Sequence, residues 1–411
     1  MFDWLRALSP QERKTLIAAF GGWSVDALDF MVYTFIIPTL IAAWGMSKGQ
    51  AGLVATASLI LSALGGWTAG ILADRYGRVK VLQITIIWFA VCTFACGFTN
   101  SFEQLLVCRA LQGLGFGGEW AVGSVLIGEM IRPEHRGKAV GTVQSGWAIG
   151  WAAAAILFAI SFSVLPEQLA WRAMFWVGLL PALLVIYIRR NVQDPEIFHA
   201  TRAKAEQTGA SFLEIFSPGL LHTTVLASLL ATGLMATYYA ITTWVPTYLK
   251  TVRHLSVLGT GWYTFVIIAG SFVGYMVSAY LNDHIGRRKT FMLFAVCTGV
   301  VAISYTFIPI SDAVMLVLGF PLGFFLSGNF SGFGPFLTEL LPSRVRGSGQ
   351  GFIYNFGRGF GAFAPPVVGY LSNAMSLAEA IGLVTGGALT LSLLALALLP
   401  ETRGKALLVY D

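Results

Sequence analysis

Long apolar segments alternate with short polar connections along the whole chain. A helix of about 20 nearly uncharged residues, rising ~1.5 Å per residue, can cross a hydrocarbon layer ~30 Å thick. The pattern therefore predicts twelve membrane-spanning helices, at residues 16–44, 51–73, 81–98, 105–131, 139–165, 170–188, 220–249, 258–281, 291–308, 313–341, 347–371 and 378–399. These segments are continuous and rich in glycine, whereas the strands of a membrane barrel alternate polar and apolar positions, which excludes a closed barrel.

Two charged motifs occur once in each half of the chain. The repeated positions are Asp74, Gly77 and Arg78, matched by Asp283, Gly286 and Arg287, and Glu129 and Arg136, matched by Glu339 and Arg346. Self-similarity over such a long period indicates a duplicated structural unit. We therefore predict an all-α membrane protein with two six-helix pseudo-symmetric halves, residues 1–190 and 218–411, joined by a polar linker at residues 191–217. Transporters built from such repeats hold their substrate near the bilayer midplane, between the repeats.

Composition and charge agree with a membrane location. The chain is 56% hydrophobic and only 11% charged, whereas soluble domains carry about 25% charged residues. Its net charge is +6, but most of the basic residues lie at the termini and in the even-numbered connections. By the positive-inside rule this places both termini in the cytoplasm, so the positive charge reflects orientation in a cytoplasmic membrane and predicts no nucleic-acid partner. We expect no cleavable signal peptide, because the first apolar segment is too long.

Chemistry other than binding finds little support in the sequence. The four cysteines lie within predicted spans without the spacing of metal ligands, and we interpret them as small core residues. Gly113, Gly115 and Gly118 match a dinucleotide fingerprint, but they lie inside an apolar helix with no preceding strand, which favours helix packing. No serine or cysteine has a recognisable catalytic base, so we predict no enzyme, no metal site and no cofactor.

Several motifs resemble those of a known family. The loop at residues 70–80 and the segment at residues 109–113 together resemble the signature of the major facilitator superfamily, and residues 400–404 resemble the terminal motif of its sugar-porter-like branch. Residues 26–30, 117–120 and 354–359 are similar to the sialate:proton symporter family, whose members include lactate and other monocarboxylate permeases.

This resemblance implies a secondary active transporter that works by alternating access, and we expect it to be a monomer. It would move a small organic anion, such as a lactate-like monocarboxylate, a sialate or an aromatic acid, in symport with protons across the lipid bilayer. Three alternatives stay open. Gln144 and Gly150 match the sugar-porter pattern, which leaves room for a sugar acid or polyol, although residues 234–244 lack the paired glutamines of hexose carriers. The others are a proton-driven efflux antiporter of amphipathic compounds and a non-transporting nutrient sensor.

Five ionisable residues lie within predicted spans, where each costs roughly 2.5 to 3.5 kcal/mol on insertion scales. They are Asp26, Asp29, Arg109, Glu119 and Arg358. Arg358 has glycine neighbours that would leave room beside its planar guanidinium, which can bind a carboxylate through two parallel hydrogen bonds. We interpret Arg358 as the anchor of the substrate anion, with a structural ion pair to Asp29 or Glu119 as the alternative.

The acidic residues are candidates for proton coupling. A carboxyl group whose arginine partner is captured by a substrate anion takes up a proton more readily. We therefore predict proton carriage by Asp29 or Glu119, with Asp26 and Arg109 in the same group. A permanent ion pair with Arg109 or Arg358, and for Asp26 a plain helix contact or a gate, are the alternatives. Symport of one monovalent anion with one proton would move no net charge.

Two further sets complete the predicted site. Candidates for shaping the substrate pocket are Tyr33, Trp120, Gln144, Trp147, Tyr238, Tyr239, Asn329, Tyr354 and Asn355. Helix packing is the alternative for each. Candidates for a gate of inter-helix ion pairs at the cytoplasmic loops are Asp74, Arg78, Glu129, Arg136, Asp283, Arg287, Glu339 and Arg346.

Overall fold

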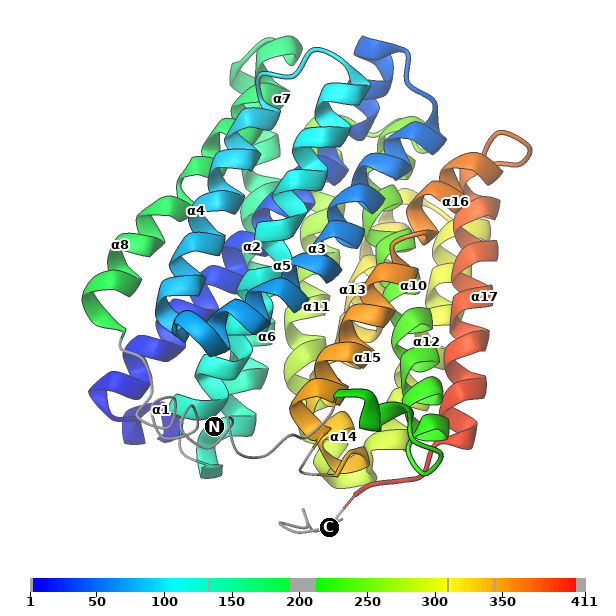
Figure 1. Cartoon of the computed structure of the whole chain (residues 1–411). Helices are drawn as coiled ribbons and strands as arrows, with labels where there is room; N and C mark the ends of the chain where they lie inside the picture. Colours follow the sequence, from blue (N-terminus) through cyan, green and yellow to red (C-terminus); the bar gives the residue numbers. More distant parts are fainter. Residues whose placement is uncertain (1–2, 132, 193–211, 309, 343–344, 404–411) are drawn as a thin grey trace.

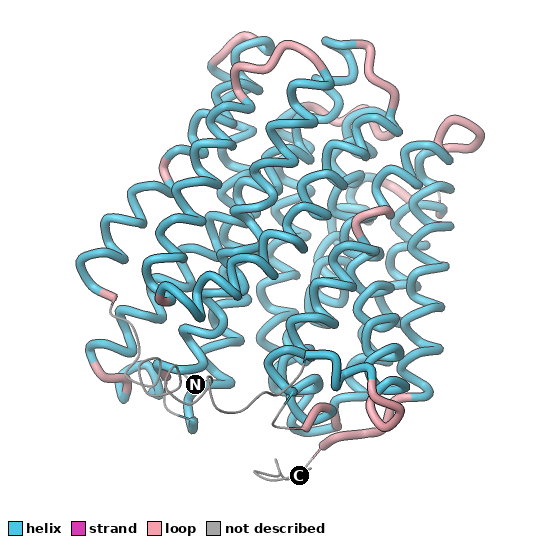
Figure 2. The backbone as a smooth tube through the Cα atoms, in the orientation of Figure 1, coloured by secondary structure: helices cyan, strands magenta, loops and turns pink. Residues whose placement is uncertain are grey.

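The computed structural model describes residues 3–131, 133–192, 212–308, 310–342 and 345–403. Over these ranges the chain is a bundle of long helices joined by short loops, and the described residues contain no strand (Figure 2). Ten of the helices are long and apolar enough to cross a membrane by length and composition. The remaining two predicted spans, the fourth and the eleventh, are also helical. The fourth contains Arg109 and Glu119, and the eleventh is divided into two helices.

The first half contains six spans. The short α1 (Asp3–Ala7) is followed by α2 (Pro10–Trp44), α3 (Lys48–Tyr76), α4 (Arg78–Cys96), α5 (Phe102–Met130) and α6 (Pro133–Val164), and the sixth span consists of α7 (Glu167–Trp176), the 3-10 turn η1 (Val177–Leu179) and α8 (Pro181–Asn191). Pro181 interrupts this span because it has no N–H group for the helical ladder.

The second half repeats this plan. After η2 (Phe212–Phe216) come α10 (Leu221–Thr251), α11 (Val257–Ile285) and α12 (Arg287–Phe307), then α13 (Asp312–Gly328), η3 (Asn329–Gly332) and α14 (Phe333–Leu340), and finally α15 (Arg346–Gly361), α16 (Ala364–Leu371) and α17 (Leu377–Leu398). Most of the predicted linker lies outside the described residues. Its described end, η2, is attached to the second half, where Thr224 Oγ1 donates a hydrogen bond to Ile215 O.

Packing follows the duplication. In the first half α2 packs on α6 and α3 packs on α5; in the second half α10 packs on α15 and α11 packs on α13. The halves meet through α2 with α10, α3 with α15 and α16, and α6 with α11. Figure 1 shows α1, the start of α2 and the end of α17 at the same end of the bundle. We call this the linker end, and the opposite end the loop end.

The repeated motif has the same backbone conformation in both halves. Gly77 separates α3 from α4 with φ 103°, and Gly286 separates α11 from α12 with φ 104°. Residues with a side chain rarely adopt this region, which explains the glycine in both copies. At other helix starts a serine accepts a hydrogen bond from the third helical N–H, as Ser9, Ser47 and Ser376 do in complete capping boxes.

The outer surface of the bundle is apolar. Large side chains such as Trp67, Leu183 and Val317 are more than half exposed, which would be unfavourable in water but suits contact with lipid. The prediction of an all-α membrane protein is therefore confirmed.

Small residues set the distance between the paired helices. A Cβ atom added at Gly117 of α5 would lie 1.6 Å from the Ser62 carbonyl oxygen of α3. In the equivalent helix pair of the second half, a Cβ atom at Gly323 of α13 would lie 1.7 Å from the Ile267 carbonyl oxygen of α11. Close backbone approach of this kind is a common way to pack helices in membranes.

We expect Gly117→Ala to lower the stability of the detergent-solubilised protein by about 1 to 3 kcal/mol, the range for overpacking, because α3 and α5 must separate. Thermal unfolding measures the effect. Gly123→Ala in the same helix is the matched control, since a Cβ there meets no atom within 4 Å. Equal melting temperatures for the two variants would contradict this account.

Candidate substrate and ion site between the two halves

Arg358 of α15 lies at the contact between the two halves. Its side chain is 2% exposed, and its guanidinium carbon lies 5.1 Å from the ring centre of Phe116 in α5 and 5.0 Å from that of Tyr354. The Nη2 atom makes one long hydrogen bond, of 3.5 Å, to the Tyr354 hydroxyl. Among the described residues, Nε and Nη1 have no hydrogen-bond partner of good geometry, although the Tyr239 side chain lies close to the guanidinium. The second half thus extends a buried cation with unused donors toward the first half.

A connected cluster of aromatic side chains from both halves reaches this cation through Phe116 and Tyr354. We call them the aromatic box: Trp23, Phe30, Phe116 and Trp147 from the first half, and Tyr238, Tyr239 and Tyr354 from the second. Trp147 Nε1 donates a hydrogen bond to the Tyr238 hydroxyl across the two halves. The Phe30 and Tyr239 ring centres are 5.8 Å apart, which forms a second cross-half contact. The box provides flat apolar faces around one positive charge.

The buried charges of the first half lie on facing sides of α2 and α5. Arg109 and Asp29 are both fully buried and form an ion pair, with Nη1 3.0 Å from Oδ2. Gln112, one turn along α5 from Arg109, donates a hydrogen bond to the same Asp29 oxygen, and Ser58 Oγ of α3 donates to Gln112 Oε1 at 2.7 Å. Asp29 is therefore held within the first half by two donors, and Arg358 is not its partner.

Asp26 does not contact Arg109, because it lies one turn before Asp29 on α2, nearer the linker end. Its near neighbour is the carboxyl group of Glu119, and Arg358 and Asp29 lie within electrostatic range. Within the part of the chain that the structure describes, no N–H or hydroxyl group donates a hydrogen bond to either oxygen of Asp26. Asp26 and Asp29 therefore belong to two separate contacts with α5.

A small pocket lies beside Glu119, in the half of the bundle nearest the linker end. Its lining residues are Ala18, Ala19, Trp23, Leu82, Glu119, Gly123 and Val143. They come from α2, α4, α5 and α6, each from the half of its helix nearest the linker end. Glu119 is the charged group of this lining, and the other side chains are apolar or aromatic.

The other candidates for the pocket have varied surroundings. Tyr33 is fully buried and donates its hydroxyl hydrogen bond to Ala51 O at 2.7 Å, which ties α2 to α3. Asn329 opens η3, with Nδ2 donating to Phe325 O and Oδ1 buried without a partner. Asn355 donates to Gly351 O in its own helix and lies near Gly66 of α3. Gln144 is 8% exposed in α6. The side chain of Trp120 lies outside the described part of the chain.

Two of the glycines beside Arg358 pack against another helix. A Cβ atom at Gly357 would lie 2.5 Å from the Ala231 Cβ, and one at Gly361 would lie 2.9 Å from the backbone nitrogen of Ala236. Both glycines therefore bring α15 close to α10. Gly359 differs from them, since a Cβ atom there would meet only the Ala63 Cβ, at 3.8 Å.

Sequence reasoning missed Trp23, Phe30 and Phe116 as site residues. They are apolar, so no polar signal marked them. Their spacing could have found them, since Phe116 lies between Gln112 and Glu119 on one face of α5 and Phe30 adjoins Asp29 on α2.

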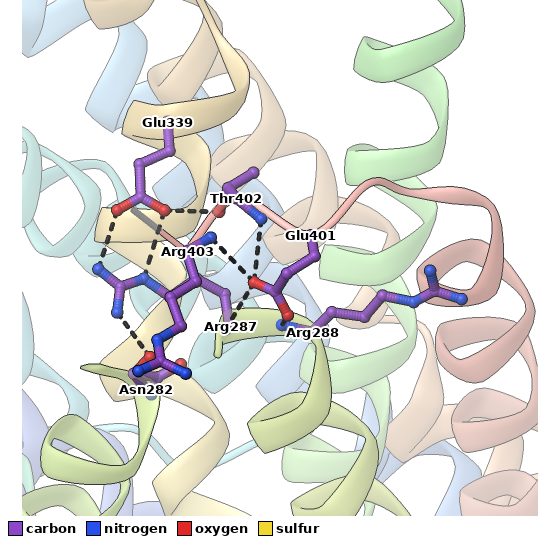
Figure 3. Close-up of polar contacts among 7 residues, drawn as sticks. All are labelled: Asn282, Arg287, Arg288, Glu339, Glu401, Thr402 and Arg403. Carbon is purple, nitrogen blue, oxygen red and sulfur yellow. Dashed lines mark hydrogen bonds and ion pairs between the residues drawn. The ribbon is translucent and has the colours of Figure 1, made fainter. Parts of the chain in front are cut away.

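Of the predicted gate, only Arg287 and Glu339 have described side chains. Arg287 Nη2 lies 2.9 Å from Glu339 Oε1, and its Nε donates to Glu339 Oε2 at 3.3 Å (Figure 3). Thr402 Oγ1 donates to the same carboxylate. The side chains of Asp74, Arg78, Glu129, Arg136, Asp283 and Arg346 lie outside the described residues. The described pair joins α12 to α14 within the second half, so it does not itself connect the two halves.

Glu401 closes the start of α12, where Gly286 offers no side-chain cap (Figure 3). Its Oε1 accepts hydrogen bonds from the backbone N–H groups of Arg287, Thr402 and Arg403, and its Oε2 accepts one from Arg288. Burial opposes ionisation of this carboxyl, but the four N–H donors outweigh it, so the pKa of Glu401 is lowered. We call Glu401, Thr402, Arg287 and Glu339 the tail clamp.

Two bundles of spans with a buried charged site between them define a membrane transporter. The family model of the Major Facilitator Superfamily matches residues 19–364 and 255–409. The chain belongs to this family, which confirms the resemblance, the twelve-helix fold and the prediction that the protein is not an enzyme.

Transporters from several bacteria match this chain over at least 90% of its length. A protein of Cupriavidus pinatubonensis (strain JMP 134 / LMG 1197), named as a probable 4-methylmuconolactone transporter, is 44% identical over 99% of this chain and 95% of its own length. The cis,cis-muconate transport protein of Acinetobacter baylyi (strain ATCC 33305 / BD413 / ADP1) is 29% identical over 90% and 89%. The sialic acid transporter NanX of Escherichia coli (strain K12) is 29% identical over 93% of both.

Among solved structures, the proton:xylose symporter XylE bound to 6-bromo-6-deoxy-D-glucose matches with a TM-score of 0.73. The match covers 97% of this chain and 98% of that chain at 17% identity. At this identity the likeness supports the fold.

We expect Asp29→Asn to cost about 3 to 5 kcal/mol of stability, because it leaves the Arg109 cation buried and uncompensated. Arg109→Gln should cost a similar amount. The double variant should cost clearly less than the sum, since neither charge remains. Chemical unfolding in detergent measures all three. Additive effects would contradict an ion pair between these residues.

We expect Glu401→Gln to lower stability by roughly 1 kcal/mol, the scale of a helix cap. A carboxylate whose pKa is lowered by folding stabilises the folded state fully above the pKa of the unfolded state, ~4.3. This contribution is lost as pH falls through the pKa of the folded state. The melting-temperature difference from wild type should thus be constant from pH 8 to pH 6 and shrink only below about pH 4.

Glu379→Gln provides the control for this clamp. Glu379 closes the start of α17 at the loop end through Ser376 alone, so its replacement should lower the melting temperature less. A Glu401→Gln difference that already shrinks between pH 8 and pH 6 would show that the carboxylate is not held by its four donors.

Proposed function

We propose that the protein is a secondary active transporter that moves a small organic anion through the aromatic box in symport with protons. The buried Arg358 is the observation that carries this proposal. Its Nε and Nη1 lack acceptors, and an unpaired cation in a low-dielectric interior is costly. A substrate carboxylate would supply the missing charge and acceptors, and the planar guanidinium can bind it through two hydrogen bonds.

The surroundings of Arg358 favour a flat, unsaturated or aromatic carboxylic acid. Phe116 and Tyr354 lie on the guanidinium at 5.1 and 5.0 Å, and Phe30, Trp147 and Tyr239 present further ring faces. Rings pack well against planar π systems and offer few hydrogen bonds to a polyhydroxylated substrate. The names of two relatives, which mention 4-methylmuconolactone and cis,cis-muconate, support this choice over a sugar acid or polyol.

The contacts between the halves support alternating access. At the loop end, Thr56 Oγ1 of α3 donates a hydrogen bond to Ala362 O. Near it, Gly52 and Gly49 pack against Pro366 and Tyr370 of α16, and a Cβ at either glycine would come within 2.5 Å. We infer that this conformation is closed at the loop end. Since Arg358 is only 2% exposed, entry of a substrate requires the halves to separate further.

The membrane placement follows from the sequence. We propose a multi-pass protein of the cytoplasmic membrane with the linker end in the cytoplasm, as the excess of basic residues in the even-numbered connections indicates. We propose that it works as a monomer, because each half contributes a different part of the site. Efflux of amphipathic compounds would not require the buried Arg358, which disfavours that alternative.

Counterflow of radiolabelled cis,cis-muconate, benzoate, lactate and sialic acid into proteoliposomes tests this function. We expect exchange of the flat unsaturated acids by the wild type, a loss of at least about 100-fold for Arg358→Gln, as for a lost charged hydrogen-bond pair, and a smaller loss for Arg358→Lys. The lysine keeps the charge but not the fork.

Substrate-induced shifts of the melting temperature give an independent measure of binding for the same variants. Unimpaired exchange by Arg358→Gln would defeat the anion anchor. Binding of acids without exchange by the wild type would favour a sensor over a transporter.

A further inference from the structure

We propose that Asp26 and Glu119 hold the coupled proton jointly, as a carboxyl dyad, and that Gly22 is the positioning residue that keeps the Glu119 carboxyl against Asp26. The inference rests on the proposed function and specifies where its proton is carried. It also assigns a role to the pocket at the linker end, which becomes the access route for the proton.

The backbone of α2 makes room for this dyad. A Cβ atom added at Gly22 would lie 1.8 Å from Glu119 Oε1 and 3.0 Å from its Cδ. The carboxyl group of Glu119 thus lies directly on the Gly22 backbone, one helical turn from Asp26. The neighbouring Gly21 faces away, since a Cβ there would meet only the flexible end of Leu184, at 3.4 Å.

The two carboxyl groups need a proton between them. Asp26 is fully buried and Glu119 is 5% exposed, and two adjacent buried carboxylates cannot both be charged at low cost. Neither oxygen of Asp26 receives a hydrogen bond from an N–H or hydroxyl donor. A single proton on one carboxyl would neutralise it and provide the donor that the other lacks.

The surrounding charges favour this dyad over Asp29 as the proton site. Asp29 has the Arg109 cation at 3.0 Å and the Gln112 amide as donors, which satisfy its ionised form. The charged groups that act on Asp26 are Glu119, Arg358 and Asp29 itself. From α4 and α6 the pocket wall contributes Leu82 and Val143, which do not titrate.

Arg358 links the dyad to the substrate. With the box empty, the guanidinium balances the one negative charge that the dyad keeps. A carboxylate bound to Arg358 takes over that balance and adds a negative charge nearby, which favours a second proton on the dyad. Linkage requires the reverse as well: protonation of the dyad strengthens anion binding. One proton then enters for each monovalent anion, and the loaded site is neutral.

Two assays on the full-length protein in proteoliposomes separate the roles. Accumulation driven by a pH gradient needs the proton step, whereas counterflow at equal pH needs only anion binding and movement of the halves. For Glu119→Gln and Asp26→Asn we expect at least a 10-fold loss of accumulation with counterflow kept within about threefold. We expect the same pattern for Gly22→Ala, because its methyl group displaces the Glu119 carboxyl.

Gly21→Ala is the matched control and should behave as wild type in both assays. A direct readout accompanies them: in weakly buffered detergent solution, addition of benzoate, a monovalent anion, should cause proton uptake by the wild type and by Gly21→Ala, and none by Glu119→Gln. Infrared spectroscopy should show the C=O band of a protonated carboxyl in the wild type that is lost in Glu119→Gln.

The outcomes distinguish the two proposals. Absence of acid counterflow in the wild type would overturn the transport function itself. Wild-type counterflow together with undiminished accumulation and proton uptake by Glu119→Gln would overturn the dyad and leave the function standing. A loss of accumulation and of proton uptake in Asp29→Asn alone would also overturn the dyad and leave the function standing. Should Gly22→Ala fail to fold, the side-chain variants carry the test, and a wild-type response in Glu119→Gln still overturns the dyad.

Discussion

An uncompensated charge in a low-dielectric interior is the constraint on which the site depends. Every buried charge between these helices must be balanced by another charge, a proton or a ligand. The first half balances Arg109 with Asp29 inside its own bundle. The second half places Arg358 among aromatic rings with two nitrogens unpartnered. We propose that this imbalance makes the contact between the halves a binding site, and that it ties occupancy by an anion to the protonation of nearby carboxyl groups.

Two successive contacts between α2 and α5 differ in their hydrogen-bond donors. Toward the loop end, Asp29, Arg109 and Gln112 form a closed polar network that Ser58 extends into α3. Toward the linker end, Asp26 and Glu119 form a contact without such donors, beside a pocket. Phe116 separates the two sets on α5 and supports Arg358 from the other half. A polar network with its donors in place and a carboxyl contact without such donors thus lie within a few helical turns of each other.

Much of the architecture could be predicted because lipid imposes long uncharged segments and duplication imposes repeated turns. The twelve spans follow from the first rule, and the matched conformations of Gly77 and Gly286 follow from the second. The predicted set of five buried charges also contained the groups that the structure brings to the contact between the halves. Their roles as anchor, proton carriers and gate stay predictions until transport is measured.

The pairing of those charges could not be predicted. Asp26 and Asp29 are one turn apart, so the rotation of α5 decides which of them meets Arg109, and that rotation is set by contacts such as Gly117 against Ser62. Gly357 and Gly361 were assigned to space around Arg358, but they serve the approach of α15 to α10. The aromatic box had no polar signal in the sequence, because apolar residues in a membrane helix look alike until their neighbours are known.

The tail clamp has a practical consequence for handling the protein. Residues 401–403 complete the first turn of α12 and hold Glu339, so they belong to the folded body and are no disposable extension. Any reporter or affinity label should be joined beyond Arg403. A truncation before Glu401 would remove the acceptor for four backbone N–H groups, and its loss of activity would report damage to the scaffold instead of to transport chemistry.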